Sequence, residues 1–245
     1  MNNIFSFERF LKVLKYDLKM RVPAIGTMFL VFLVLPHVLH FVMNYDSVFR
    51  ESLRMELIGT MLFCISFFAP FSIYSVLREK QGAGSYIMIP ASGLEKFASM
   101  VLICSVILPI VFCVGSLIVD SLFTLVFRNM YGGFISLQQA DAKFELGRVF
   151  VTVFSIVGAS LLGNAVFKGK ASFKTILCLL VIAYLWGAYI TGFIFDHVLD
   201  EGNIDQSVLM SKGNQLQQIT VTVYAVVSIL FYCLTYWRIK KIQIS

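Results

Sequence analysis

The chain has 245 residues, of which 58% are apolar, 15% aromatic and only 14% charged, and its mean hydropathy is +0.83. Soluble domains carry about 25% charged residues, so this chain has too little charge to cover a soluble globule of its size. Its 24 phenylalanines also exclude a disordered or collagen-like chain, because such chains lack the apolar area whose burial offsets the cost of ordering. The composition predicts a membrane protein.

The chain also carries a formal net charge of +6, which favours an acidic partner. Its basic residues gather at the ends of apolar runs, where they would meet lipid headgroups and fix the orientation in a bilayer. We therefore expect the lipid bilayer, and no nucleic acid, as that partner. The five cysteines fall inside apolar runs and lack the Cys-x-x-Cys spacing of a metal or redox site, so we interpret them as packing residues.

Residues 3–20 have the pattern of an amphipathic helix. Apolar and charged positions recur at the same spacing on opposite faces: Phe7, Leu11, Leu14 and Leu18 against Glu8, Lys12, Lys15 and Lys19. Such a helix buries its apolar stripe at the headgroup boundary and lies in the plane of the membrane. It is either a general basic anchor or the leading helix of a transporter. No cleavable signal peptide is expected, since the first long apolar run follows this charged helix.

Six apolar runs follow along the chain. A bilayer core about 30 Å thick requires ~20 apolar residues as a helix, and an outer-membrane barrel would show short alternating segments instead. We therefore predict one all-α domain covering residues 1–245. Its six spans are residues 22–43, 57–77, 97–119, 149–167, 175–195 and 219–237.

Lys and Arg in the connections set the orientation, because basic residues are retained on the cytoplasmic side. Fourteen of the 20 lie on one side of the predicted bundle: Arg9, Lys12, Lys15, Lys19, Arg21, Arg78, Lys80, Lys96, Lys168, Lys170, Lys174, Arg238, Lys240 and Lys241. The other side has Arg50, Arg54, Arg128, Lys143, Arg148 and Lys212. Both termini are expected in the cytoplasm.

The connection between the second and third spans, residues 78–96, is the most informative. Gly82 and Gly84 let the chain leave the second helix, and residues 86–89 form a short apolar patch at the membrane surface. Pro90 ends that patch. The segment is therefore more than a minimal turn.

A capping box follows the patch. Ser92 and, three residues later, Glu95 are the residue types that satisfy the free amide groups at a helix start. They predict that the third helix begins at Gly93.

This connection resembles that of the membrane subunits of type 2 ABC exporters. In that family a charged "ER" sequence, a Gly-Thr step and a Pro-Val-Ser-x-x-Glu sequence surround the coupling helix, which sits on the ATPase subunit. The matching positions here are Arg78-Glu79-Lys80, the glycine-rich step, the apolar patch and Pro90-Ala91-Ser92 with Glu95-Lys96. The predicted in-plane helix, six spans and internal termini resemble the family as well.

The resemblance implies the permease subunit of a bacterial ABC exporter in the cytoplasmic (inner) membrane. Its pathway would form in a dimer with a second permease subunit, identical or different, and a separate ABC ATPase subunit would bind ATP and Mg. The residues implied in ATPase coupling are Arg78, Glu79, Tyr86, Ile87, Met88, Pro90, Ser92, Glu95 and Lys96. Residues 86–89 would insert into a groove of the ATPase, and the charged residues would set the pattern at its rim.

Catalytic sequence patterns do not occur in this chain. It lacks the P-loop G-x-x-x-x-G-K-[ST], a nucleophile elbow and the His-Glu-x-x-His zinc pattern. We therefore expect neither an enzyme nor a cofactor, metal or catalytic site within the chain.

Alternatives remain for the connection and for the function. Residues 78–96 and the lysines of residues 168–174 also suit ordinary basic turns between spans. The chain could be a non-transporting immunity or sequestration subunit, or a secondary transporter coupled to ions. Asp120 is the intramembrane carboxylate such a transporter would use, although we expect it near the outer interface. His37 and His40 share a helix face, but no third metal ligand is evident.

Overall fold

The computed structural model describes residues 5–43, 48–78, 90–131, 133–135, 142–194 and 206–244. Within these ranges the regular elements are all helical. In chain order they are α1 (Phe7–Met20), the 3₁₀ turn η1 (Val22–Ile25), α2 (Gly26–Met43), α3 (Glu51–Ile73), the 3₁₀ turn η2 (Ser75–Arg78), α5 (Gly93–Leu102), the π turn η3 (Ile103–Ile107), α6 (Leu108–Val126), α7 (Arg128–Tyr131), α8 (Ala142–Val166), α9 (Ala171–Ile194) and α10 (Gln206–Ile244).

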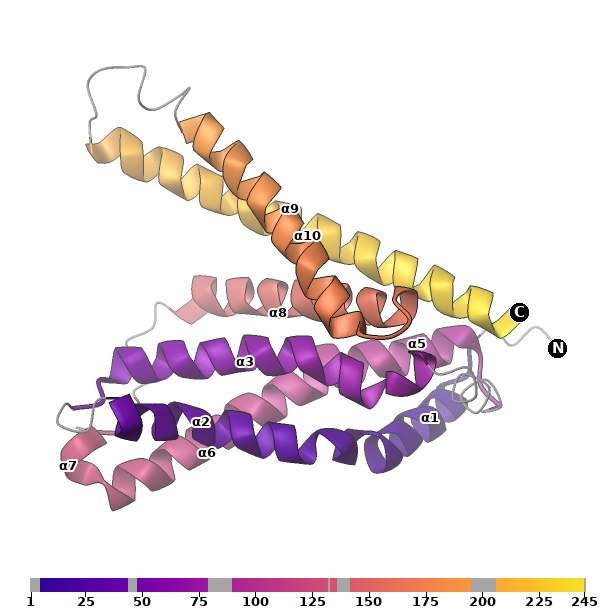
Figure 1. Cartoon of the computed structure of the whole chain (residues 1–245), viewed down its shortest axis with the longest axis horizontal. Coiled ribbons are helices and arrows are strands. Elements are labelled where there is room, and N and C mark those ends of the chain that lie inside the picture. The colour runs from indigo at the N-terminus through magenta and orange to yellow at the C-terminus, as the bar shows by residue number, and fades with distance from the viewer. Residues whose placement is uncertain are drawn as a thin grey trace.

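Six helical stretches in the described ranges are long and apolar enough to cross a membrane, which confirms the all-α class and the number of spans. They are Phe7–Val42, Glu51–Ile73, Gly93–Val126, Gly147–Val166, Ala171–Ala188 and Gln218–Lys241. Figure 1 shows α1 and the last turns of α10 at one end of the molecule and α7 at the other. This arrangement is the one expected for an even number of antiparallel spans.

The helices extend beyond the apolar runs that predict them. Helix α3 starts at Glu51, six residues before the predicted second span, and therefore includes Arg54. Helix α10 has 39 residues, a length of about 58 Å at ~1.5 Å per residue, which exceeds a hydrocarbon core about 30 Å thick. Polar residues can continue a helix wherever water or partner side chains satisfy them, so hydropathy locates the spans better than the helix ends.

The third span contains a wider helical turn. Helix α5 leads into the π turn η3, and α6 resumes at Leu108 with Pro109 in its first turn. Proline has no N–H to donate to the preceding turn, so Pro109 sits where that bond is already lost. Pro36 and Pro70 lie inside α2 and α3.

The Asn164 side chain of α8 donates hydrogen bonds to backbone carbonyls at the C-terminal end of α3. The Asn164 Nδ2 group donates to the backbone oxygens of Pro70 at 3.1 Å and Tyr74 at 2.9 Å. The Pro70 oxygen also accepts from the Tyr74 N–H, and the Tyr74 oxygen from the Leu77 N–H. Asn164 therefore adds a second hydrogen bond to each carbonyl at the end of α3, where helical N–H donors run out. The contact joins two helices that are 90 residues apart in sequence.

The buried core lies among α2, α3, the α5–η3–α6 span and α8, with fully buried side chains such as Ile65, Met100, Phe112 and Leu161. Helix α9 contributes little to it and exposes large apolar side chains, among them Tyr184. In Figure 1, α9 and the first part of α10 diverge from the other helices, whereas the second part of α10 runs back toward α8 and α5, where its Tyr232 and Ile239 are buried. An exposed apolar helix of this kind is expected where lipid surrounds the protein.

Small residues on α8 permit close packing within the chain. A Cβ atom at Gly158 would lie 3.2 Å from the Tyr232 ring on α10. A Cβ atom at Gly163 would overlap the Thr175 side chain on α9, whose Cβ and Cγ2 would both be 2.9 Å away. Glycine at position 163 therefore sets the approach of α8 to α9.

Replacing Gly163 by alanine is expected to lower the free energy of unfolding by about 1–3 kcal/mol, the usual cost of overpacking. Detergent-solubilised protein unfolded with SDS and followed by circular dichroism measures this loss. Gly187→Ala, on α9, is the matched control, because no atom lies within 4 Å of a Cβ placed there. Equal stability of the Gly163→Ala variant and the wild type would contradict the close contact.

Candidate functional site

The predicted coupling residues fall partly within the described ranges. Pro90, Ser92, Glu95 and Lys96 are described, and Arg78 is described as the last residue of η2 without its side chain. Glu79, Tyr86, Ile87 and Met88 lie outside the described residues. The described part of the connection is therefore its exit into α5.

The predicted capping box at the start of α5 is confirmed. Ser92 Oγ accepts a hydrogen bond from the Glu95 N–H at 3.2 Å, and Glu95 Oε2 accepts one from the Ser92 N–H at 2.8 Å. Helix α5 begins at Gly93 as predicted. The two bonds satisfy amide groups that a helix start leaves free, so the exit from the connection is held rigidly.

Glu95 also binds the N-terminal helix. Its Oε1 atom accepts hydrogen bonds from the Ser6 N–H at 2.7 Å and from Arg9 Nη2 at 3.0 Å. The carboxylate side chain is fully buried by these contacts. One side chain thus caps α5 and holds the start of α1, which is 86 to 89 residues away in sequence.

A second contact joins the same two helices further along. Asp17 Oδ2 accepts a hydrogen bond from Ser99 Oγ at 2.8 Å, and Asp17 Oδ1 pairs with Arg21 Nε at 3.1 Å. The Arg21 guanidinium lies 5.6 Å from the centre of the Tyr74 ring, at the end of α3. Lys96, which follows Glu95 in sequence, is also buried, with 1% of its surface exposed.

We call these residues the α1–α5 clasp: Ser6, Arg9, Asp17, Arg21, Ser92, Glu95, Lys96 and Ser99. Buried charges are tolerated only when paired and hydrogen-bonded, because their desolvation is costly. The clasp therefore favours one relative position of α1 and α5. Glu95 and Lys96 face the interior of the chain, so any part they play in coupling is to position helices.

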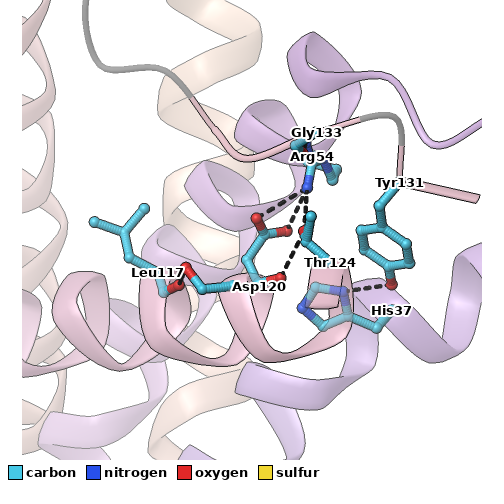
Figure 2. A network of polar contacts seen from close by, with 8 residues as sticks. His37, Arg54, Leu117, Asp120, Thr124, Tyr131 and Gly133 are labelled. Carbon is cyan, nitrogen blue, oxygen red and sulfur yellow. Dashed lines mark hydrogen bonds and ion pairs between the residues drawn. The ribbon is translucent and has the colours of Figure 1, made fainter. Parts of the chain in front are cut away.

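A second polar cluster lies at the opposite end of the molecule (Figure 2). Arg54 Nη1 donates to Asp120 Oδ1 at 3.2 Å, to Asp120 Oδ2 at 2.9 Å and to Thr124 Oγ1 at 3.1 Å. Arg54 Nη2 donates to the Gly133 carbonyl oxygen at 2.6 Å. Both charged side chains are almost fully buried. The pair joins α3 to α6 and holds the chain segment that follows α7.

Aromatic rings complete this cluster. Tyr131 OH and His37 Nδ1 form a hydrogen bond of 2.9 Å, and the His37 ring stacks on Phe123. The His40 ring stacks on Phe49 with the ring centres 4.0 Å apart. Burial raises the pKa of Tyr131 to about 12, so the hydroxyl stays protonated at neutral pH. The two histidines pack in an aromatic layer rather than facing a common ligand.

We call the outer group the Arg54 cluster: His37, Arg54, Asp120, Thr124, Tyr131 and Gly133. Nowhere in the described ranges do three or more His, Cys, Asp or Glu side chains gather as a metal site. The sequence interpretation identified Asp120 but treated Arg54 as one of the basic residues of a connection. A lone carboxylate in an apolar span requires a partner, and this requirement was the signal that could have prompted a search for a basic residue such as Arg54.

Comparisons of the chain with protein-family models, curated proteins and solved structures gave no match. The class of protein is given by the fold itself: with six helices long and apolar enough to cross a bilayer, it is an all-helical multi-pass membrane protein.

Replacing Glu95 by alanine is expected to release α1 from α5. Ser6 and Arg9 lose their acceptor and the α5 cap is removed, a change of ~1 kcal/mol or more, so backbone amides of α1 should exchange about five-fold faster. Hydrogen–deuterium exchange in detergent measures the rate. Glu8→Ala is the control, because Glu8 pairs with Lys12 on the exposed side of α1. Unchanged α1 exchange in Glu95→Ala would refute the clasp.

The Arg54–Asp120 pair is expected to show strong coupling. Arg54→Met and Asp120→Leu should each lower the free energy of unfolding by about 3–5 kcal/mol, because each leaves a buried charge without its partner. The double variant should recover a large part of the summed loss. Unfolding in detergent of all four proteins gives the coupling energy. Arg50→Met, at an exposed position on the same side, serves as the control. Strict additivity of the two single losses would refute the pairing.

Proposed function

We propose that this chain is the permease subunit of a bacterial ABC exporter. Two such subunits, identical or different, would form the pathway in the cytoplasmic membrane. Separate ATPase subunits would bind the connection between the second and third spans. In this arrangement both termini and residues 78–96 face the cytoplasm, and α1 lies in the plane of the membrane.

The α1–α5 clasp is the observation that carries this proposal. A soluble ATPase can drive a membrane subunit only if its contact is joined to helices that cross the membrane. Residues 78–96 lead directly into α5 through a double cap, and the same Glu95 side chain holds α1. Displacement of the connection would therefore be passed to two helices at once.

The predicted coupling residues other than Pro90 have the following roles in this scheme. Tyr86, Ile87 and Met88 are the apolar side chains that would dock on the ATPase, with Arg78 and Glu79 at the edge of the contact. Ser92 and Glu95 would make the exit rigid. Lys96, buried within the clasp, would help keep α5 in place.

Asp120 gives limited support to an ion-coupled transporter. A carboxylate that exchanges protons or sodium ions needs access and a free charge in part of its cycle. Here both carboxylate oxygens accept hydrogen bonds from Arg54, which is itself buried. The pair has the geometry of a structural contact between α3 and α6.

The proposal predicts a partner. Affinity purification of the chain from its native membranes in mild detergent should yield a soluble P-loop subunit that hydrolyses ATP. Recovery of the chain alone, or with membrane partners only, would favour the immunity, sequestration or secondary-transport alternatives and overturn the exporter proposal.

A variant locates the contact. Replacing Tyr86, Ile87 and Met88 together by alanine should sharply reduce the amount of ATPase recovered, while membrane insertion stays unchanged. The control replaces three exposed apolar residues at the far end of α6, Leu122, Leu125 and Val126, by alanine. Undiminished ATPase recovery with the first variant would remove residues 86–88 from the contact.

A further inference from the structure

Helix α1 presents three different sides along its length. Asp17 and Val13 face the protein and are buried. Phe7 and Leu11 are exposed, at 65% and 45%. Because successive residues turn by about 100°, these two apolar side chains lie roughly a third of a turn from the buried side.

The third side of α1 is basic and exposed. It carries Lys12, Lys15 and Lys19, which follow one another at helical spacing beside the apolar side. All three ammonium groups are thus presented next to Phe7 and Leu11, on a surface that the protein itself does not cover.

The acidic residues of α1 leave this positive charge largely uncompensated. Asp17 is buried and bound to Ser99 and Arg21, and Glu8 bonds Lys12 at 2.7 Å. Among the described ion pairs, none involves Lys15 or Lys19. The exposed part of the helix therefore has a net positive charge beside an apolar stripe.

We infer that this exposed surface of α1 binds anionic phospholipid. Phe7 and Leu11 would enter the boundary of the acyl chains, and Lys12, Lys15 and Lys19 would contact the phosphate groups. An anionic headgroup suits the three lysines better than a zwitterionic one, because a choline or ethanolamine group places a second positive charge near them. The partner is therefore the anionic fraction of the leaflet on this side.

The clasp gives the lipid contact a consequence. Lipid bound on one side of α1 would hold the helix whose Arg9 side chain and Ser6 amide donate to the Glu95 carboxylate.

 Glu95 in turn caps α5, so the lipid contact would steady the start of α5 as well. In the exporter proposed above, ATPase coupling would then depend on anionic lipid. This consequence rests on the proposed function, whereas the lipid surface itself does not.

The test uses the full chain in lipid nanodiscs without any ATPase. One set contains phosphatidylcholine alone and the other an equal mixture of phosphatidylcholine and phosphatidylglycerol. Hydrogen–deuterium exchange should be slower across α1 in the mixture, and this protection should be lost when salt screens the charges. Equal exchange of α1 in the two lipids would overturn the inference.

A lysine variant and its control separate a local surface from net charge. K12Q/K15Q/K19Q should abolish the difference between the two lipids. K168Q/K170Q/K174Q removes the same charge from three exposed lysines, two in the α8–α9 connection and one in the first turn of α9, and should keep the difference. Retention of the lipid difference in the first variant, or its equal loss in both, would refute a binding surface on α1. Neither result bears on whether an ATPase binds, so the lipid surface and the exporter can fail separately.

Discussion

A charge removed from water must find its partner inside the protein, and this constraint holds both ends of the bundle. At one end the Glu95 carboxylate is fully buried and binds Arg9 and two backbone amides. At the other end Arg54 binds Asp120. Because leaving either partner alone is costly, each pairing specifies which helices meet, in a bundle whose apolar surfaces alone discriminate weakly between packing arrangements.

The third span connects the two ends. Its first part, α5, begins in the α1–α5 clasp, and its last part, α6, carries Asp120 and Thr124 into the Arg54 cluster. Helices α1 and α3 meet it at one end or the other through hydrogen bonds of Asp17 and Arg54, and α2 meets it where His37 stacks on Phe123. The N-terminal half of the chain is therefore built around one span. Helix α9, in contrast, stays largely exposed.

Features encoded by neighbouring residues were predictable from the sequence. Hydropathy located six spans, and the Ser92–Glu95 spacing located the start of α5, because both depend on residues a few positions apart. Features that depend on distant pairs were not. The sequence placed Glu95 at a cap but contained no sign that Ser6 and Arg9 would share it, and Arg54 was assigned to a connection because its helix begins before the apolar run.

The π turn in the third span has a bearing on both clusters. A π turn accommodates one more residue than the α-helical turn it replaces, and one residue corresponds to about 100° of rotation around a helix. Straightening residues 103–107 into a regular α-helix would therefore rotate α6 about its axis relative to α5. With Glu95 held in the clasp, Asp120 would then point away from Arg54. The wider turn sets the angular phase between the two ends of the span, and it allows both buried charges to be paired at the same time.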